Sequence, residues 1–302
     1  LAGRSVFDIE ELLDLEALRL PALRCAVEMA CWDLIGKITG QPICRLLGGE
    51  YRHRVPVTVP VGGGAVETVA TKARELAGQG YFWQMVRATG EVEADFELLT
   101  AIRQVAGNRV DLRFDIAGRY DLDTTVALCD RLEAGAVSCL LDPTSAFVGN
   151  PPDRPAPESV SEQYSHLRHE FLALQQQVAI SLAVGRPVAG PASLYSLIRD
   201  TPPASVTIDL QRVGGVLNAG KCASIAQAAG IRLALGLRPM LGIGTAAMVQ
   251  IAACSPAFSI GCFCAHHLLH DDLLAEPLEI VDGLIRLPGL PGLGVEVDRA
   301  RL

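Results

Sequence analysis

The sequence has no surplus of basic residues and no long apolar run. Its 302 residues include 26 Lys and Arg against 34 Asp and Glu, which gives a formal net charge of −8 at pH 7. Since nucleic acids and anionic membranes bind clustered positive charge, we expect neither as a partner. No apolar run reaches the ~18 residues that a membrane-spanning helix needs. The high mean hydropathy of +0.30 is instead typical of a barrel whose strands are buried on both faces.

A cysteine framework and the common short motifs for zinc and nucleotides are also lacking. The nine cysteines are scattered through apolar segments, which indicates reduced, buried thiols in a cytoplasmic protein. Cys262 and Cys264 are separated by a single residue, which is not a zinc-ligand spacing. No Gly-x-Gly-x-x-Gly follows an early strand, so a dinucleotide site of that kind is not expected. The first residues show no signal-peptide pattern.

From residue 55 onward, short apolar runs alternate with longer helical patterns. Such alternation predicts a parallel sheet with helical crossovers. Strands are expected near 55–61, 83–88, 110–115, 137–141, 179–184, 205–209, 231–236 and 257–262. Helices are expected near 66–78, 94–106, 123–134, 160–177, 191–199, 215–229 and 243–253. Eight strands with helices between them favour a (β/α) barrel, and an open doubly wound sheet is the alternative.

The strand at 110–115 ends in an acid, Asp115, and the chain breaks soon afterwards at Gly118. In a (β/α) barrel the carboxyl ends of the strands face the active site, so Asp115 is a candidate functional carboxylate. The alternative is a structural ion pair or hydrogen-bond acceptor, because perturbed charges mark functional sites only statistically. The choice depends on the partners that the neighbouring strand ends provide.

Four motifs occur in a fixed order between about residues 23 and 298. They are the helix end Trp32-Asp33-Leu34-Ile35-Gly36-Lys37, the segment DLQRVGG from Asp209, the segment GIGTAA from Gly242, and the closing Pro291-Gly292-Leu293-Gly294-Val295. Together they resemble the mandelate racemase/muconate lactonizing enzyme group of the enolase superfamily. The resemblance implies an α/β fold with a modified TIM barrel and an α+β capping domain whose first strands this sequence lacks. We expect the helical remainder of that domain at 1–54, the barrel at 55–280, and a tail returning to the capping domain at 281–302.

The resemblance also implies a Mg²⁺-assisted reaction at the α-proton of a carboxylic acid. In the family, carboxylates at the ends of the third, fourth and fifth strands hold the metal, which stabilises the enediolate formed on proton removal. The first ligand position falls on Asp115. The second falls on Leu141, and the adjacent Asp142 could replace it only if the strand shifts by one residue. The third falls on Arg186, and a guanidinium cannot ligate a cation.

The positions of the family's bases are changed as well. The second strand, which in the family ends in Lys-x-Lys, ends here in Met85-Val86-Arg87. The seventh strand carries Arg238 near the place of a histidine in the racemase branch, and Asp209 matches the acid that orients that histidine. Arginine stays protonated near neutral pH and is a poor general base. Asp209, Arg87 and Arg238 are therefore the candidate catalytic residues, with no titrating group among the expected bases.

Two functions remain open at this point. One is a racemase, dehydratase or cycloisomerase with unusual or lost metal ligation. The other is a catalytically degenerate homologue that keeps the barrel and binds a small carboxylic acid without metal. For the second, we hypothesise that the Arg186 guanidinium takes the place of the metal and pairs with Asp115, either in a carboxylate pocket or as an internal salt bridge. In both cases the family resemblance implies a homo-oligomer.

Two smaller features have both a functional and a structural interpretation. Gly214-Gly215 opens a helix whose amide groups could meet an anion, or it only forms a turn. His266 and His270 are four residues apart, as two metal ligands on one helix face would be, or they belong to a surface cluster. Asp33 and Lys37, also four residues apart, predict a structural ion pair.

Overall fold

The structure is a computed structural model that describes residues 5–8, 13, 20–147, 160–265 and 268–301. The chain divides into two compact units. One comprises residues 1–57, 188–195 and 208–302, and the other comprises residues 58–187 and 196–207. Within the described ranges, no helix is long and apolar enough to cross a membrane.

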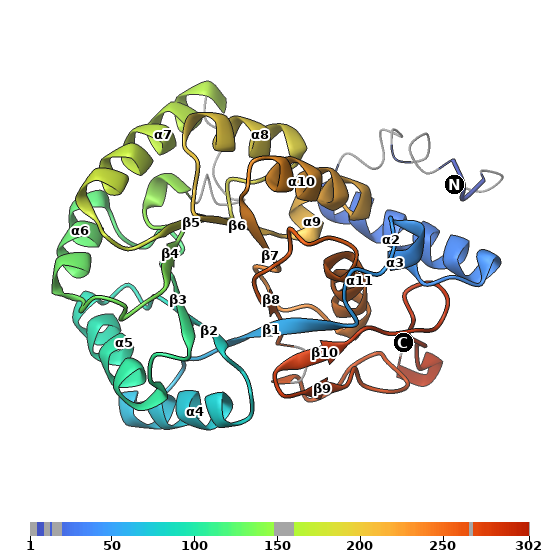
Figure 1. Cartoon of the computed structure of the whole chain (residues 1–302), viewed down its shortest axis with the longest axis horizontal. Helices are drawn as coiled ribbons and strands as arrows, with labels where there is room; N and C mark the ends of the chain where they lie inside the picture. The colour runs from blue at the N-terminus through green and yellow to red at the C-terminus, as the bar shows by residue number, and fades with distance from the viewer. Residues whose placement is uncertain (1–4, 9–12, 14–19, 148–159, 266–267, 302) are drawn as a thin grey trace. The chain divides into compact units, whose positions relative to one another are not determined.

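The unit formed by residues 58–187 and 196–207 contains a parallel sheet in which strands β1 to β6 pair in sequence order. The strands are β1 (Arg54–Pro60), β2 (Trp83–Arg87), β3 (Asp111–Asp115), β4 (Cys139–Leu141), β5 (Leu182–Val184) and β6 (Ser205–Ile208). Every residue of β4, β5 and β6 is buried, as expected for strands covered on both faces. The covering helices, which lie outside the strands in Figure 1, are α4 (Val66–Gly78), α5 (Val92–Ala106), α6 (Leu122–Arg131) and α7 (Val160–Gln177).

Local sequence signals set the ends of these helices. The side chain of Asp121 caps α6 by accepting a hydrogen bond from the Thr124 amide at 2.9 Å. Helix α5 carries Glu93 and Asp95 in its first turn, where negative charge meets the positive end of the helix dipole. After β4 the chain forms a short 3₁₀ turn, η2 (Ser145–Phe147).

The unit that contains residues 208–302 holds the remaining strands, β7 (Arg232–Leu235), β8 (Cys262–Phe263), β9 (Ile280–Val281) and β10 (Leu284–Arg286). Strand β8 pairs with β1, and β10 pairs antiparallel with both β1 and β9. The last strand of the eight pairs with the first, as the (β/α) barrel that the sequence predicts requires. The helices of this unit are α2 (Pro21–Thr39), α3 (Ile43–Leu46), α9 (Leu210–Val213), α10 (Val216–Ala228), α11 (Gly242–Ala253) and η4 (Arg299–Arg301), and α8 (Pro191–Asp200) begins in it.

Helix α2 is held against the C-terminal tail by a close approach of two glycines. A Cβ atom built on Gly36 would lie 2.5 Å from the Cα atom of Gly292, so neither backbone leaves room for a side chain there. The predicted ion pair on this helix is present, with Lys37 Nζ 2.6 Å from Asp33 Oδ2. Asp33 Oδ1 also accepts a hydrogen bond from the Leu293 amide at 2.9 Å. The motifs at the two ends of the chain therefore pack on one another.

One sequence prediction differs from the structure near the C-terminus. Of the strand expected near 257–262, only Cys262 lies in β8, and Ala257 and Ile260 form backbone hydrogen bonds with Leu233 from a loop. After it, β9 and β10 form a short hairpin around Asp282 and Gly283. Both strands of that hairpin are too short to give a periodic pattern in the sequence.

Candidate functional site

The strand ends of the 58–187 unit bring Asp115 together with the residues predicted to surround it. In the parallel ladder Arg87, Asp115 and Leu141 are direct neighbours, and Leu141 in turn pairs with Ala183. Side chains that pair in a ladder share a face of the sheet. Asp115 has no exposed surface. A buried carboxylate at this level needs charged or hydrogen-bonding partners to offset its desolvation.

Arg186, which follows β5, supplies the main partner. Its Nη1 and Nη2 atoms donate to Asp115 Oδ1 and Oδ2 at 2.7 and 2.9 Å, which is a bidentate arrangement. Nη1 also lies 2.7 Å from Asp142 Oδ2. The Arg186 side chain is 16% exposed, whereas both aspartates have no exposed surface. The pairing between Arg186 and Asp115 that the sequence suggests is therefore present, and a second acid joins it.

Asp142 reaches this arginine without any shift of its strand. Leu141 stays in register with Asp115, and the next residue, Asp142, turns into the left-handed region with φ +47. The backbone turn, and not a shift of the strand by one residue, directs the Asp142 side chain toward Arg186. Asp142 Oδ1 and Oδ2 accept hydrogen bonds from the amides of Gly185 and Arg186 at 2.8 and 3.0 Å. A left-handed non-glycine residue costs free energy and persists only where such contacts hold it.

The charges in this cluster balance. Arg87 completes it with Nε 3.1 Å from Asp115 Oδ2, and its side chain is 47% exposed. Two arginines therefore face two aspartates. Burial raises the pKa of Asp142 to about 6, and the charge of Arg186 limits this rise. Burial alone would lower the pKa of Arg186, but its hydrogen bonds to Asp115 and its attraction to both acids raise it, so the guanidinium stays charged.

The residues at these strand ends do not fit a magnesium ion. Both carboxylates already bind the Arg186 guanidinium, which carries a positive charge where a cation would have to lie. The fourth-strand position is Leu141, which has no side-chain oxygen, and Mg²⁺ requires several oxygen ligands in near-octahedral geometry. In the part of the chain that the structure describes, no group of three or more His, Cys, Asp or Glu residues could hold a metal.

Asp95 fixes the loops that follow β2 and β3, and the sequence did not single it out. It is fully buried and accepts hydrogen bonds from the Thr89 amide, at 3.0 Å for each carboxylate oxygen, and from the Thr89 hydroxyl at 2.9 Å. It also accepts a hydrogen bond from the Tyr120 hydroxyl. Burial and this bond raise the pKa of Tyr120. Thr89 follows Arg87 closely and Tyr120 follows Asp115, so Asp95 joins the two loops next to the cluster.

A second arginine–aspartate pair lies at the end of β6 and belongs to the unit with residues 208–302. Asp209 caps α9, and its Oδ1 atom accepts from the amides of Gln211 and Arg212 at 3.0 and 3.2 Å. Its Oδ2 atom lies 3.0 Å from Arg238 Nε, and the Arg238 side chain is 58% exposed. The sequence-predicted residues Asp209 and Arg238 are thus in direct contact, and Arg238 stands where the resemblance implies a base.

The helix that begins after Gly214-Gly215 meets an anion from within the chain. Glu28 of α2 is fully buried, and its Oε1 atom accepts from the Leu217 amide in the first turn of α10 at 2.6 Å. Trp32 Nε1 donates to the same oxygen at 3.2 Å. A Cβ atom on Gly215 would lie 2.1 Å from Glu28 Oε2, which explains the glycine. Burial raises the pKa of Glu28. Glu28 was missed because a helix cap supplied by another element leaves no local sequence signal.

The histidine pair proposed from the sequence lies outside the described residues, since His266 is not described. His270 is exposed. The pair therefore stays a prediction.

Comparisons with known proteins agree with this architecture. Residues 68–301 match the family model described as "Enolase C-terminal domain-like". The chain is 29% identical to the L-Lys-D/L-Arg epimerase of Methylococcus capsulatus, over 98% of this chain and 78% of the relative. It is 27% identical to muconate cycloisomerase 1 of Rhodococcus opacus, over 99% of this chain and 76% of the relative.

Solved structures of proteins from the same family share the fold of this chain. A mandelate racemase/muconate lactonizing family protein from Azoarcus sp. EbN1 superposes with a TM-score of 0.85 at 22% identity, covering 99% of this chain and 78% of that one. The match to a single family model covers more than half of the chain, and epimerases and cycloisomerases are among its relatives. This chain belongs to the enolase superfamily, in its mandelate racemase/muconate lactonizing enzyme group.

Proposed function

We propose that this chain is a metal-independent member of its family that binds small carboxylic acids and does not catalyse metal-assisted proton abstraction. The observation that carries the proposal is the Arg186 guanidinium bonded to both Asp115 and Asp142. Magnesium would have to displace a buried arginine that makes three short charged hydrogen bonds. Removing one partner from such a buried network is costly, so metal binding at this point is strongly disfavoured.

The candidate bases support the same proposal. Removal of an α-proton needs a group that accepts a proton near neutral pH. Arg87 and Arg238 are guanidinium groups that stay protonated, and each is held by an aspartate at 3.1 and 3.0 Å. Within the described strand ends that the resemblance singles out, neither position offers a base. Deprotonation of a carboxylic acid at its α-carbon therefore lacks both its metal and its base.

Arg238 is the group best suited to hold a carboxylate. Asp209 bonds its Nε atom, which fixes the plane of the guanidinium. Among the described residues its two Nη atoms have no hydrogen-bond partner, and the side chain is 58% exposed. Two parallel N–H groups match a carboxylate bidentately. Muconate and N-succinylated arginine or lysine, which appear in the names of relatives, both carry carboxylates and define the class of compound to test.

Calorimetry tests the proposal directly. Titration with Mg²⁺ or Mn²⁺ is expected to release no heat of binding, and Asp115→Ala is expected to behave identically. Titration with muconate or N-succinyl-lysine in the presence of a chelator is expected to show binding that Arg238→Ala weakens. Arg131→Ala is the matched control, because Arg131 forms a surface pair with Glu93 on the helical side of the sheet. Tight metal binding that Asp115→Ala abolishes would refute the proposal.

A gain-of-metal variant sharpens the same test. The double variant Leu141→Glu/Arg186→Glu restores the family's carboxylates at both changed ligand positions. We expect this variant to bind Mg²⁺ or Mn²⁺ where the original chain does not, since three strand-end carboxylates supply the hard oxygen ligands. If both proteins bind the metal equally, Arg186 does not exclude it.

The second candidate function is an epimerase, racemase or cycloisomerase activity, which the relatives in the family favour. This function predicts that an α-proton of a carboxylic acid exchanges with deuterium from D₂O. Proton NMR in the presence of Mg²⁺ measures the exchange. Exchange that requires Arg87 or Asp209 would establish this activity. Absence of exchange across dipeptides, N-succinyl amino acids and muconate is the result that we expect.

Location and assembly remain proposals of the same kind. All nine cysteines are free, and seven of them are buried, which supports a reducing cytoplasmic location. A symmetric homo-oligomer is proposed from the family resemblance and is tested by light scattering at several protein concentrations.

A further inference from the structure

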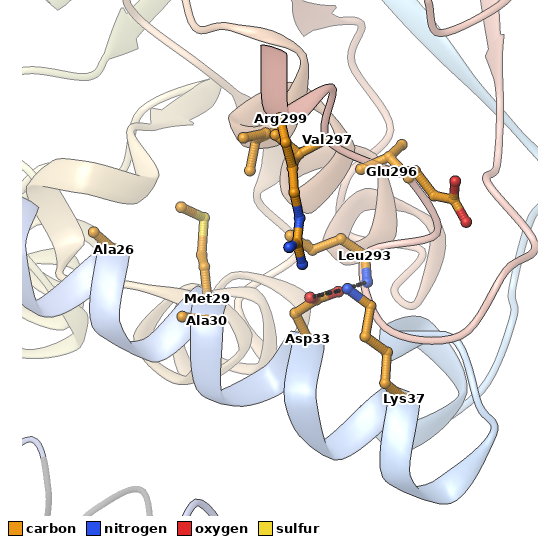
Figure 2. A pocket seen from close by; sticks show the side chains of 11 residues that line it. Ala26, Met29, Ala30, Asp33, Lys37, Leu293, Glu296, Val297 and Arg299 are labelled. Atoms are coloured by element: carbon orange, nitrogen blue, oxygen red, sulfur yellow. Dashed lines mark hydrogen bonds and ion pairs between the residues drawn. The ribbon is translucent and has the colours of Figure 1, made fainter. Parts of the chain in front are cut away.

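A cavity of about 680 Å³ lies beside helix α2, and no residue of the aspartate–arginine pairs described above lines it (Figure 2). Its walls come from α2, from the start of α11 and from the C-terminal tail, all within the unit that contains residues 208–302. Cavities of this size are typical of small-molecule sites. The cavity plays no part in the proposed function of the strand ends.

The walls of this cavity are largely apolar. Ala26, Met29 and Ala30 project from one face of α2, as their spacing of three and four residues requires. Leu293 and Val297 of the tail face them. Small side chains on the helix leave the space open, and Met29 lines it with a flexible apolar side chain. An apolar body of a ligand would be desolvated by these walls.

Of the two cations that line the cavity, Lys37 is paired with Asp33, whereas Arg299 has no ion pair with any residue that the structure describes. Each carboxylate oxygen of Asp33 already accepts a hydrogen bond, one from Lys37 and the other from the Leu293 amide. Figure 2 shows the Glu296 carboxylate turned away from the cavity and the Arg299 guanidinium extending into it. Across the described residues, Arg299 makes no hydrogen bond or ion pair. An anionic group of a ligand is therefore favoured beside Arg299.

Arg301 provides the contrast that makes Arg299 informative. It lies in the same short turn, η4, but its Nη1 atom is 3.0 Å from Asp271 Oδ1 and its Nε atom is 3.1 Å from Asp298 Oδ2. Acidic partners are thus available next to Arg299, which points into the cavity instead. A guanidinium that is unpaired among the described residues and lies next to apolar side chains is suited to a carboxylate joined to an apolar group.

We propose that this cavity binds a small amphiphilic carboxylic acid, with its carboxylate on Arg299 and its apolar body against Met29, Ala26 and Ala30. The complementarity of charge at one end and of apolar surface along the rest selects this class over neutral or cationic molecules. The site shares no residue with the strand-end sites of Arg186 and Arg238, so it can be tested independently of the proposed function.

Octanoate is the probe, and calorimetry with the whole chain is the measurement. Arg299→Ala is expected to weaken octanoate binding roughly tenfold or more, because it removes the charged hydrogen bonds to the head group. Arg301→Ala is the matched control and is expected to leave the affinity unchanged. Met29→Trp fills the cavity and is expected to abolish binding while thermal unfolding stays cooperative. Arg131→Ala, at a surface ion pair, is expected to leave octanoate binding intact. Repeating the titrations in an Arg238→Ala background removes any contribution from the carboxylate site proposed at the end of β6.

Three results would overturn the proposal. The first is equal binding of octanoate by the original chain and by Arg299→Ala. The second is equal binding of octylamine, which carries the opposite charge on the same apolar chain. The third is a dimer that Met29→Trp dissociates and that octanoate does not affect, since the cavity would then be a contact between two copies of this chain.

Discussion

Two aspartate–arginine pairs at strand ends of one barrel differ in how far they are removed from water. Arg186 is 16% exposed and lies between Asp115 and Asp142, which have no exposed surface. Arg238 is 58% exposed and touches only one carboxylate oxygen of Asp209. Both pairs have similar N···O distances. The two pairs differ in how deeply the arginine is buried and not in the length of the ion pair.

The difference assigns the two arginines to different tasks. The donors of a buried arginine must be satisfied within the protein, so Arg186 acts as the shared counterion of Asp115 and Asp142. An exposed arginine that is fixed at Nε keeps two donors for a ligand. Removal of Arg186 should therefore change folding, and removal of Arg238 should change binding. Four predictions test this division, in order of decreasing effect.

Arg186→Ala is expected to have the largest effect on stability. It leaves the buried Asp142 without a cation and Asp115 with only the half-exposed Arg87, and breaking a buried ion pair in this way costs about 3–5 kcal/mol. Urea unfolding followed by circular dichroism measures the change. Adding Asp142→Asn to the variant should recover part of the loss, because the unpaired charge of Asp142 is removed. A loss similar to that of an exposed pair would mean that Arg186 is not the counterion.

The pH dependence of unfolding should show the free energy cost of ionising the buried Asp142 carboxyl. Its carboxyl ionises near pH 4 when unfolded, and its pKa in the folded chain is raised to about 6. Between these values the folded state binds more protons, so the contribution of Asp142 to stability is complete below pH 4 and is lost as pH rises through 6. The expected loss is at most about 3 kcal/mol. Urea titrations from acid to neutral pH measure it in the original chain and in Asp142→Asn.

The comparison with Asp142→Asn isolates the group. The stability of the original chain relative to this variant should fall as pH rises. A difference that is constant or that rises with pH contradicts the assignment.

Arg186→Lys is expected to have a smaller effect than the alanine variant. Lysine keeps the charge but lacks the planar guanidinium that donates to both oxygens of Asp115 and to one oxygen of Asp142. A loss of about 1–3 kcal/mol is expected from the missing charged hydrogen bonds. The same variant offers a check on the geometry, since a lysine as stable as arginine would show that charge alone matters at this position.

Arg238→Ala is expected to change stability least, by less than about 1 kcal/mol, because exposed ion pairs contribute little. Its effect should appear in carboxylate affinity instead. If Arg238→Ala destabilises the chain as much as Arg186→Ala, the contrast between the two pairs does not hold.

Strand ends were the part of this molecule that the sequence predicted best. Asp115 and Arg186 each follow an apolar run that predicts a strand of a parallel barrel. The order of these strands suggested that the two side chains meet at the carboxyl ends of the strands. Asp142 was different, because a pattern with a period of two residues cannot show a single left-handed residue. The buried acceptors Glu28 and Asp95 escaped for another reason. Their partners come from other elements, and such contacts have no fixed spacing in the sequence.

The turn of the backbone at Asp142 bears on how the strand ends would do without a metal under the proposed function. Replacing the glutamate of the family's fifth-strand motif by Arg186 adds two positive charges, as many as a magnesium ion carries. The leucine at 141 removes one acid, and the left-handed turn returns another from the next residue. Under the proposed function, the net charge of the strand ends is thus conserved without the ion. The exchange of a metal for an internal cation then takes substitutions at two positions and no change in the register of any strand.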